Sequence, residues 1–422
     1  MNFEEISKTL PFSKNIDCLK KPMTVGGKFF PNRLAIQPME GADGTRDGAP
    51  DELVVRRYER FAGSGAGLIW FEATAVSHDG RANPRQLYLH EKNADEYKRL
   101  VENIREIAFK ENKNEPVIIM QATHSGRYSK PDKAPAPLAA CNNPVYEKAG
   151  PLPISAIITD EKIKRIEEQY ITTTKLAVGC GFDGIDVKAC HRYLNSELLS
   201  AFTRDGEYGG SLENRFRFFK NCVENARGVS PKNFIVTSRM NIYDGIPHPY
   251  GFGVKANDLP APTDGPPFAP EDIEPDLMEP IELIKILNLP LVNITMGNPY
   301  FNPQVNRPTD LAAVERMYAL TRKVKDATGA VVVSSAPTFM RENSTYLAAG
   351  AVEQNFADFV GYGRMAFAYP EFARDTLNGA FDKKKTCVTC GKCTELMRVE
   401  LAGCAVRDPV YTDLYRRLKK PE

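Results

Sequence analysis

Residues 182–218 read FDGIDVKACHRYLNSELLSAFTRDGEYGGSLENRFRF, and this stretch says more about the fold than any other part of the chain. Its beginning, 182–187, is an apolar run with the length of a buried strand. Lys188, His191 and Tyr193 follow, so three chemically active side chains leave the end of this strand together. Barrel enzymes keep their chemistry at the carboxyl ends of their strands. The stretch therefore predicts a barrel strand with an active site at its end.

The same alternation of a short apolar run and a longer amphipathic segment recurs along the chain. The apolar runs lie at residues 34–39, 67–73, 116–122, 182–187, 234–240, 291–295, 330–334 and 356–362. Helical segments follow, for example at residues 94–110, 160–178, 214–226, 311–327 and 346–354. Thr159 and Thr309 are the candidate amino-terminal caps of two of these helices, and a third opens after Glu213.

Eight strand and helix pairs predict a (β/α)₈ TIM barrel. The main alternative is a doubly wound sheet. It is weakened because no Gly-x-Gly-x-x-Gly motif stands between a strand and a helix.

Composition excludes several classes of protein. The 422 residues are 42% hydrophobic, enough for a large core, and their net charge of +1 gives no reason to expect a nucleic acid or an anionic membrane as the main partner. The amino end lacks an export signal, and no apolar run approaches the length of a membrane span, so we expect a cytoplasmic protein. Nine irregularly spaced cysteines argue against a disulfide framework. Their thiols are predicted to be free or bound to metal.

Two segments fall outside the barrel pattern. Residues 246–280 are rich in proline, glycine and aspartate, and we interpret them as a lid, a subunit contact or a surface excursion without function. From residue 383 a basic run and clustered cysteines form a small appendage. The predicted organisation is a barrel over residues 1–379, with the 246–280 insertion, and a carboxy-terminal segment over residues 380–422.

Several strand ends resemble the old yellow enzyme family. The matching motifs are Pro38-Met39, FEATAV at 71–76, QATHSGR at 121–127 and the 191–218 block with its Tyr-Gly-Gly-Ser-x-Glu-Asn-Arg signature. The similarity runs over roughly residues 23–379. It implies a bound FMN and redox chemistry at the carboxyl end of the barrel.

The resemblance assigns contacts to the flavin ring. Gln121 and Arg239 take the positions that hydrogen bond the pyrimidine edge, where a guanidinium stabilises the anionic reduced flavin. The backbone of Pro38, Met39 and Ala73 is expected to approach the ring.

Glu40 departs from this pattern, because relatives place threonine, cysteine or histidine there, close to the flavin. An ionised carboxylate would oppose flavin reduction. The alternatives are that Glu40 is protonated, turned away or bound to a cationic substrate.

The loops after the seventh and eighth predicted strands are candidates for binding the FMN phosphate, as in many barrels. They contain Ser335, Ala336, Gly363 and Arg364. Small residues allow backbone amides to approach a phosphate, and the arginine adds charge.

Three residues are candidates for catalysis. Tyr193 matches the proton donor of the ene-reductases of the family, which protonates the α-carbon of an activated alkene after hydride transfer from flavin N5 to the β-carbon. His191 and Lys188 occupy the two positions whose donors hold the substrate carbonyl, although the second is usually histidine. The alternatives are a structural role for His191 and packing alone for Tyr193. Arg192, where glycine is common, either narrows the pocket, adds a charge or faces solvent.

Cys387, Cys390, Cys393 and Cys404 form a Cys-x2-Cys-x2-Cys-x10-Cys pattern. Three closely spaced thiols with a fourth farther on fit the ligation of a [4Fe–4S] cluster, and a zinc site is the alternative. The pattern resembles the branch of the family with 2,4-dienoyl-CoA reductase and trimethylamine dehydrogenase, although the loop before Cys404 is shorter.

Those relatives continue into a nucleotide-binding region, whereas this chain ends at Glu422. We therefore expect electrons from NAD(P)H at the FMN, or from a separate protein such as reduced ferredoxin or a flavoprotein. The expected function is an FMN- and [4Fe–4S]-dependent ene-reductase in an anaerobe, acting on a small molecule whose C=C bond is conjugated to a carbonyl or carboxyl group. Amine dehydrogenase chemistry, an electron-transfer subunit and a homo-oligomer are further alternatives. The amine reading is weakened by the single tryptophan, Trp70, and by the absence of a cysteine beside Met39.

Overall fold

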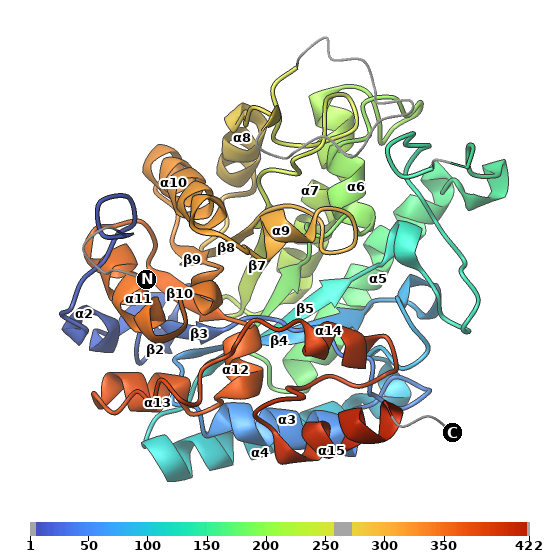
Figure 1. The fold of residues 1–422 in the computed structure, drawn as a ribbon. Coiled ribbons are helices and arrows are strands. Elements are labelled where there is room, and N and C mark those ends of the chain that lie inside the picture. Colours follow the sequence, from blue (N-terminus) through green and yellow to red (C-terminus); the bar gives the residue numbers. More distant parts are fainter. Residues whose placement is uncertain (1–5, 148, 257–271, 420–422) are drawn as a thin grey trace.

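A closed barrel of eight parallel strands forms the centre of the molecule. The computed structural model of the chain describes residues 6–147, 149–256 and 272–419 (Figure 1). The strand order is β10-β3-β4-β5-β6-β7-β8-β9. The strands are β3 (Leu34–Ile36), β4 (Leu68–Ala75), β5 (Val117–Thr123), β6 (Gly184–Val187), β7 (Ile235–Asn241), β8 (Val292–Thr295), β9 (Val332–Ser334) and β10 (Phe359–Tyr362). Each coincides with one of the eight apolar runs, so the predicted TIM barrel is confirmed and the doubly wound alternative is wrong.

Helices connect the strands and cover the outside of the barrel (Figure 1). The longer ones are α3 (Glu52–Ala62), α4 (Ala94–Asn112), α5 (Asp160–Gly179), α7 (Leu212–Val229), α8 (Met278–Leu287), α10 (Leu311–Thr328) and α11 (Ser344–Glu353). The shorter ones are α2 (Asp17–Lys20), α6 (Leu194–Leu199), α9 (Pro303–Asn306), α12 (Arg364–Ala368) and α13 (Phe372–Leu377). Within the described ranges, no helix is both long and apolar enough to cross a membrane.

The caps of three helices test the predicted helix starts. Thr159 caps α5, since its side chain accepts a hydrogen bond from the amide of Lys162, as predicted. Asp310 rather than Thr309 caps α10, because the Asp310 carboxylate reaches the Ala313 amide at 2.8 Å. The third helix, α7, opens after Ser211 and not after Glu213. In each corrected case a neighbouring side chain satisfies the first free amides of the helix better.

An antiparallel hairpin, β1 (Met23–Val25) and β2 (Lys28–Phe30), closes the amino-terminal end of the barrel, and the sequence analysis did not predict it. Gly26 and Gly27 form its turn with φ of +57° and +79°, which suits glycine. Val25 and Phe30 pack against barrel residues that include Trp70. This end is filled by apolar side chains, so the polar side chains of the strands gather at the opposite end.

The carboxy-terminal segment lies along α3, with α14 (Lys392–Met397) and α15 (Pro409–Leu418) on the outer surface (Figure 1). Asp408 is buried and accepts two hydrogen bonds from Arg56, at 2.8 and 2.9 Å, and another from Arg60. Arg57 donates to the carbonyl of Ala402 at 3.1 Å. Three arginines of one helix thus hold the segment against the barrel.

The 246–280 insertion is only partly described. Residues 257–271 lie outside the described residues, and the lid or subunit-contact hypothesis falls partly on them. Tyr243, just after β7, donates to the carbonyl of Ile273 at 2.7 Å and so ties the second flank to the barrel, and Val254 of the first flank pairs with Pro275 of the second.

Candidate active site and cysteine pocket

Adjacent strands place Gln121, Asp186 and Arg239 at the same edge of the barrel. The Gln121 amide donates to Asp186 Oδ2 at 2.6 Å, and the Arg239 backbone amide donates to Asp186 Oδ1 at 2.7 Å. The indole of Trp70 also donates to Asp186, at 2.7 Å. Burial raises the pKa of Asp186 to about 6, although these hydrogen bonds oppose the shift. Asp186, which sequence reasoning missed, fixes the orientation of Gln121.

The Arg239 guanidinium is buried, and no carboxylate among the described residues forms a salt bridge with it. One of its terminal nitrogens donates to the Pro38 carbonyl at 3.4 Å, whereas Nε has no hydrogen-bond partner. Burial lowers the pKa of Arg239. A buried cation without a salt-bridge partner in the described residues, at the same barrel edge as Gln121, fits the electron-rich edge of a flavin, so these residues suit FMN.

The two predicted phosphate loops lie next to each other at the ends of β9 and β10. Ser335 accepts a hydrogen bond from Gln37 Nε2 at 3.1 Å and donates to the Ile294 carbonyl at 2.9 Å. Ala336 has a φ of +72°. A Cβ at Gly363 would lie 2.8 Å from Met39 Sδ, so any larger residue would have to displace the Met39 side chain. The loops are small and turned, as backbone binding of phosphate requires.

Glu40 and Lys188, the two departures from the family pattern, form an ion pair. Lys188 Nζ lies 3.0 Å from Glu40 Oε2, and the side chains are only 1% and 16% exposed. The Tyr193 hydroxyl donates to the other carboxylate oxygen of Glu40 at 2.6 Å. The three predicted states of Glu40 stay predictions, and the structure adds a pairing that was not among them. An internal cation compensates its charge, so Lys188 is engaged by Glu40.

Tyr193 stands at the centre of this group. Lys188 Nζ lies 3.7 Å from the centre of its ring, and its hydroxyl is 2.9 Å from that of Tyr300. Burial, followed by the neighbouring Glu40, raises the pKa of Tyr193 well above its ordinary value. The phenol is therefore protonated at neutral pH and able to act as an acid.

Further tyrosines surround Tyr193. The ring of Tyr300, 55% exposed, lies 4.5 Å from that of Tyr128 and stacks on Tyr193 at 6.3 Å. Asn298 donates to the Tyr128 hydroxyl at 2.9 Å. Sequence reasoning missed Tyr128 and Tyr300, because no periodic signal marks loop residues that meet in space.

His191 is half-buried close to the same group, with a φ of +65°. Burial, and then the cations of Arg239 and Lys188, lower the pKa of His191 well below its ordinary value, so the imidazole is neutral. Its Nε2 lies 3.3 Å from the Asn306 amide nitrogen. Because this amide donates, Nε2 accepts, and the proton of the ring is assigned to Nδ1.

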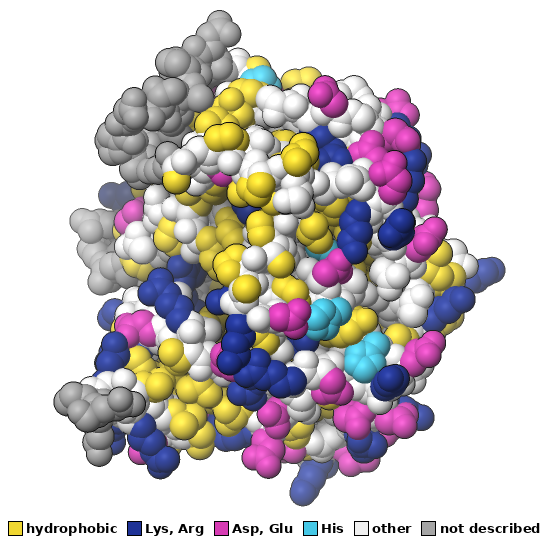
Figure 2. Space-filling model, turned by 90° about the vertical axis from the view of Figure 1, so that its right-hand side faces the viewer, with side chains coloured by type: hydrophobic (Ala, Val, Ile, Leu, Met, Phe, Trp, Pro, Cys, Tyr) yellow, Lys and Arg dark blue, Asp and Glu magenta, His cyan; other side chains and the backbone are white. Residues whose placement is uncertain are grey.

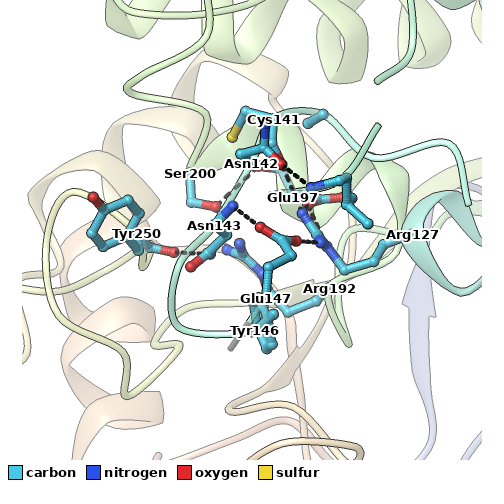
Figure 3. A network of polar contacts seen from close by, with 12 residues as sticks. Arg127, Cys141, Asn142, Asn143, Tyr146, Glu147, Arg192, Glu197, Ser200 and Tyr250 are labelled. Carbon is cyan, nitrogen blue, oxygen red and sulfur yellow. Dashed lines mark hydrogen bonds and ion pairs between the residues drawn. The ribbon is translucent and has the colours of Figure 1, made fainter. Parts of the chain in front are cut away.

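Arg192 is buried, so the prediction that it faces solvent is wrong. Its guanidinium pairs with Asp244 at 3.0 Å, donates to Ser200 and lies 5.5 Å from the centre of the Tyr146 ring. Figure 3 shows it beside a second buried arginine, Arg127. The aspartate supplies the countercharge that makes burial tolerable.

Arg127 fixes the loop that follows β5. It binds Glu197 at 2.7 Å, pairs with Glu147 and donates to the Cys141 carbonyl at 2.7 Å (Figure 3). The Tyr146 hydroxyl, in this loop, lies 3.4 Å from Asn298 Nδ2. The network therefore connects this loop to the tyrosines at the barrel mouth.

The four predicted ligand cysteines line one pocket, together with Arg364 and Arg407. The Thr389 amide lies 3.4 Å from Cys387 Sγ, and the Arg407 amide lies 3.3 Å from Cys404 Sγ. Amide hydrogen bonds to sulfur are a feature that tunes iron–sulfur sites.

Two further observations bear on metal binding at this pocket. In the described part of the chain no three or more His, Cys, Asp or Glu side chains converge closely enough to hold a single metal ion. A [4Fe–4S] cluster uses each thiolate on a different iron, so thiols spread around a pocket fit it. Arg364, predicted to bind phosphate, lines this pocket and so lies between the β10 loop and the cysteines.

A buried ion network connects the active-site loop to the cysteine segment. The register of β4 shifts at Glu72, and this side chain points toward Gly41 and Arg57. Its carboxylate accepts a hydrogen bond from the Gly41 amide at 2.6 Å and another from the Arg57 guanidinium, also at 2.6 Å. Arg57 binds Asp43 at 2.7 Å and the Ala402 carbonyl at 3.1 Å. One arginine thus contacts the loop beside Glu40 and the backbone before Cys404.

Comparison with known proteins agrees with this geometry. Residues 19–252 match the model of the NADH:flavin oxidoreductase / NADH oxidase family. The NADPH dehydrogenase of Clostridium acetobutylicum is 30% identical over 243 residues, which are 56% of this chain and 66% of that protein. A metal reductase of Desulforamulus reducens is 24% identical over 92% of this chain and 53% of its own length. The chain thus spans about half to two thirds of the length of these relatives.

Solved structures share the fold. A 2-naphthoyl-CoA reductase complex superimposes with a TM-score of 0.77 at 21% identity, covering 95% of this chain and 58% of that one. Histamine dehydrogenase from Rhizobium sp. 4-9 gives a TM-score of 0.71 at 20% identity, covering 94% and 53%. The old yellow enzyme homologue of Zymomonas mobilis gives 0.63 at 19% identity, covering 86% and 93%. With the family match spanning more than half of its residues, this chain belongs to the NADH:flavin oxidoreductase / NADH oxidase family, whose members are flavin-dependent oxidoreductases.

Proposed function

We propose that this protein is an FMN- and [4Fe–4S]-dependent ene-reductase that saturates a C=C bond conjugated to a carbonyl or carboxyl group. The observation that carries the proposal is the placement of Tyr193, a buried phenol hydrogen bonded to Glu40 at 2.6 Å. It shares the barrel mouth with Arg239 and Gln121, the residues suited to the flavin edge. Bound FMN would supply the hydride for the β-carbon.

Tyr193 then has the task of delivering a proton to the α-carbon. Loss of that proton would leave a phenolate beside the Glu40 carboxylate, and two adjacent anions repel each other. Lys188 offsets both charges, because its ammonium lies 3.0 Å from the carboxylate and 3.7 Å from the centre of the phenol ring. Lys188 and Glu40 are therefore positioning residues for the acid. His191 would donate from Nδ1 to the substrate carbonyl.

The remaining predicted contacts complete the cofactor sites. Pro38, Met39 and Ala73 would face the ring, and Ser335, Ala336, Gly363 and Arg364 the phosphate. Cys387, Cys390, Cys393 and Cys404 would hold the cluster, which exchanges single electrons. NAD(P)H, ferredoxin or a flavoprotein would supply these electrons. We further propose a cytoplasmic location in an anaerobe, and the division into a barrel, 1–379, and a cysteine segment, 380–422.

Anaerobic stopped-flow spectroscopy tests the reaction. The protein reduced with dithionite is mixed with a panel of enones, enoates and enoyl thioesters, and flavin absorbance is followed. Reoxidation by members of the panel at rates above the buffer control supports the proposal. Failure of every alkene, with rapid reoxidation by a one-electron acceptor, would show an electron-transfer subunit instead.

The tyrosines at the mouth favour a second candidate, oxidation of an amine at its C–N bond. Tyr128, Tyr193 and Tyr300 present ring faces near the Glu40 carboxylate, and such surfaces attract ammonium groups. Trp70 takes no part, because its indole is buried on Asp186. Histamine and trimethylamine are suitable probes. Reduction of the oxidised flavin by either amine, without another donor, would favour this candidate over alkene reduction.

A further inference from the structure

The cysteine segment is far more basic than the rest of the chain. Residues 383–407 contain six lysines and arginines against two glutamates, a net charge of +4, whereas the whole chain carries +1. The remainder of the protein is therefore acidic on balance. Such a concentration of one sign next to a predicted redox centre creates a local field that favours negatively charged partners.

The two acidic side chains of this segment are each paired with a base. Glu395 lies 2.9 Å from Lys419 Nζ, and Glu400 lies 3.9 Å from Arg46. Four basic side chains of the segment, Lys383, Lys384, Arg398 and Arg407, are exposed. The positive charge is thus presented to solvent and not cancelled within the segment.

A fifth cation joins them from the barrel. Arg341 is exposed and donates to the carbonyl of Val388, a residue of the cysteine pocket, at 3.1 Å. We define the basic rim as Arg341, Lys383, Lys384, Arg398 and Arg407.

Two members of the basic rim border the cysteine pocket, because Arg407 lines it and Arg341 binds Val388, which also lines it. Cys390 is exposed, and Val406, which lines the same pocket, is 37% exposed. Val399 is 45% exposed on the same segment. Figure 2, which views the molecule from the right-hand side of Figure 1, shows Lys and Arg side chains gathered below the centre next to apolar ones. A small apolar centre with a charged border is the usual composition of a protein interface.

We propose that the basic rim docks an acidic one-electron carrier protein, which delivers its electron at the cysteine pocket. The proposal rests on the proposed function, because it names the partner of that same cluster. Two reduced carriers each lose one electron, and these two electrons with two protons saturate one C=C bond. Interfaces of electron carriers are small and short-lived, so association depends on electrostatic steering more than on buried area.

Binding of purified acidic ferredoxin to the iron-loaded protein is the test, with affinity measured by calorimetry at 50 and 500 mM NaCl. We expect at least about tenfold weaker binding at the higher salt, since salt screens exposed charges. The triple variant Lys383→Glu, Lys384→Glu, Arg398→Glu should lose about tenfold or more at 50 mM NaCl. A matched variant, Lys232→Glu, Lys285→Glu, Lys323→Glu, makes the same charge change at exposed lysines outside the cysteine segment and should bind as the wild type does.

The rates of reduction by dithionite and by ferredoxin distinguish loss of partner binding from loss of the cofactors. Both triple variants should keep their iron content and the wild-type rate of reduction by dithionite, whereas only the rim variant should be reduced more slowly by ferredoxin. Equal losses in both variants, salt-independent binding, or equally tight binding of basic cytochrome c would overturn the proposal. Displacement of ferredoxin by duplex DNA, added at the same concentration of negative charges as the ferredoxin, would also overturn the proposal. A protein without iron or flavin would refute the proposed function. The affinities for ferredoxin would still show whether the basic rim binds an acidic protein.

Discussion

Removing one partner of the Glu40–Lys188 pair should destabilise the protein strongly, whereas removing both should not. Two unit charges 3.0 Å apart attract by about 5 kcal/mol at an effective dielectric constant of about 20. Part of this is spent on desolvation, and loss of one partner of a buried pair typically costs about 3–5 kcal/mol. Because Glu40 is 16% exposed, we expect about 3 kcal/mol for Lys188→Met and a similar value for Glu40→Gln.

The double variant Lys188→Met, Glu40→Gln leaves no uncompensated charge, so its loss should fall below the sum of the single losses by about 2 kcal/mol or more. Urea unfolding followed by circular dichroism, at one fixed FMN concentration, measures these free energies. Lys164 and Glu207 provide the matched control: their charges are 2.8 Å apart, but the side chains are 49% and 57% exposed. That cycle should show no measurable coupling. Additive losses at Glu40 and Lys188 would refute the ion pair.

Three further changes probe the two redox sites. Tyr193→Phe should slow alkene-dependent flavin reoxidation by about 10²–10⁴-fold, because protonation of the alkene needs the acid. Flavin reduction does not need it and should change little, so equal slowing of both steps in stopped flow would contradict this role. Cys404→Ser should lower the iron content while FMN remains bound, and metal analysis with the flavin spectrum checks this; unchanged iron would exclude Cys404 as a ligand. Asp186 has a pKa raised by burial to about 6 from an ordinary 3.8, so the folded state binds more protons than the unfolded state between these values. The free energy of unfolding should therefore fall by on the order of 3 kcal/mol as pH rises from about 4 to about 6, and stay level above that. Unfolding experiments on wild type and Asp186→Asn across this range isolate the effect as the difference between their free energies of unfolding. A difference that is constant with pH would argue against a raised pKa of Asp186.

The barrel could be predicted because each strand is buried on both sides and therefore reads as a continuous apolar run. Short elements were harder to predict. The strands of the β1–β2 hairpin have three residues each, too few for a periodic signal. Asp310 and Thr309 are both able to cap α10, and only the geometry of the chain decides between them.

Fewer of the contacts in the candidate site than of the strands could be predicted from the sequence. Glu40 and Lys188 each appeared as an unexplained departure from the family pattern, yet they are 148 residues apart and their pairing is a property of the closed barrel. Glu40 and Lys188 carry opposite charges and follow strands that end at the same barrel mouth, and this was the signal from which their pairing could have been predicted. Tyr300 and Asp186 contact the site through loops and neighbouring strands, and no local pattern marks them. The solvent-facing alternative for Arg192 stayed open for a related reason, because its partner Asp244 lies beyond the next strand.

The central claim is that one chain holds FMN at the barrel mouth and an iron–sulfur cluster among Cys387, Cys390, Cys393 and Cys404. The direct measurement is a flavin, iron and sulfide analysis, with the visible spectrum, of the protein purified without oxygen. We predict about one FMN, four irons and four sulfides per chain, and a broad absorbance near the flavin bands that bleaches on reduction. A protein with zinc in place of iron, or one that binds no flavin, would contradict it.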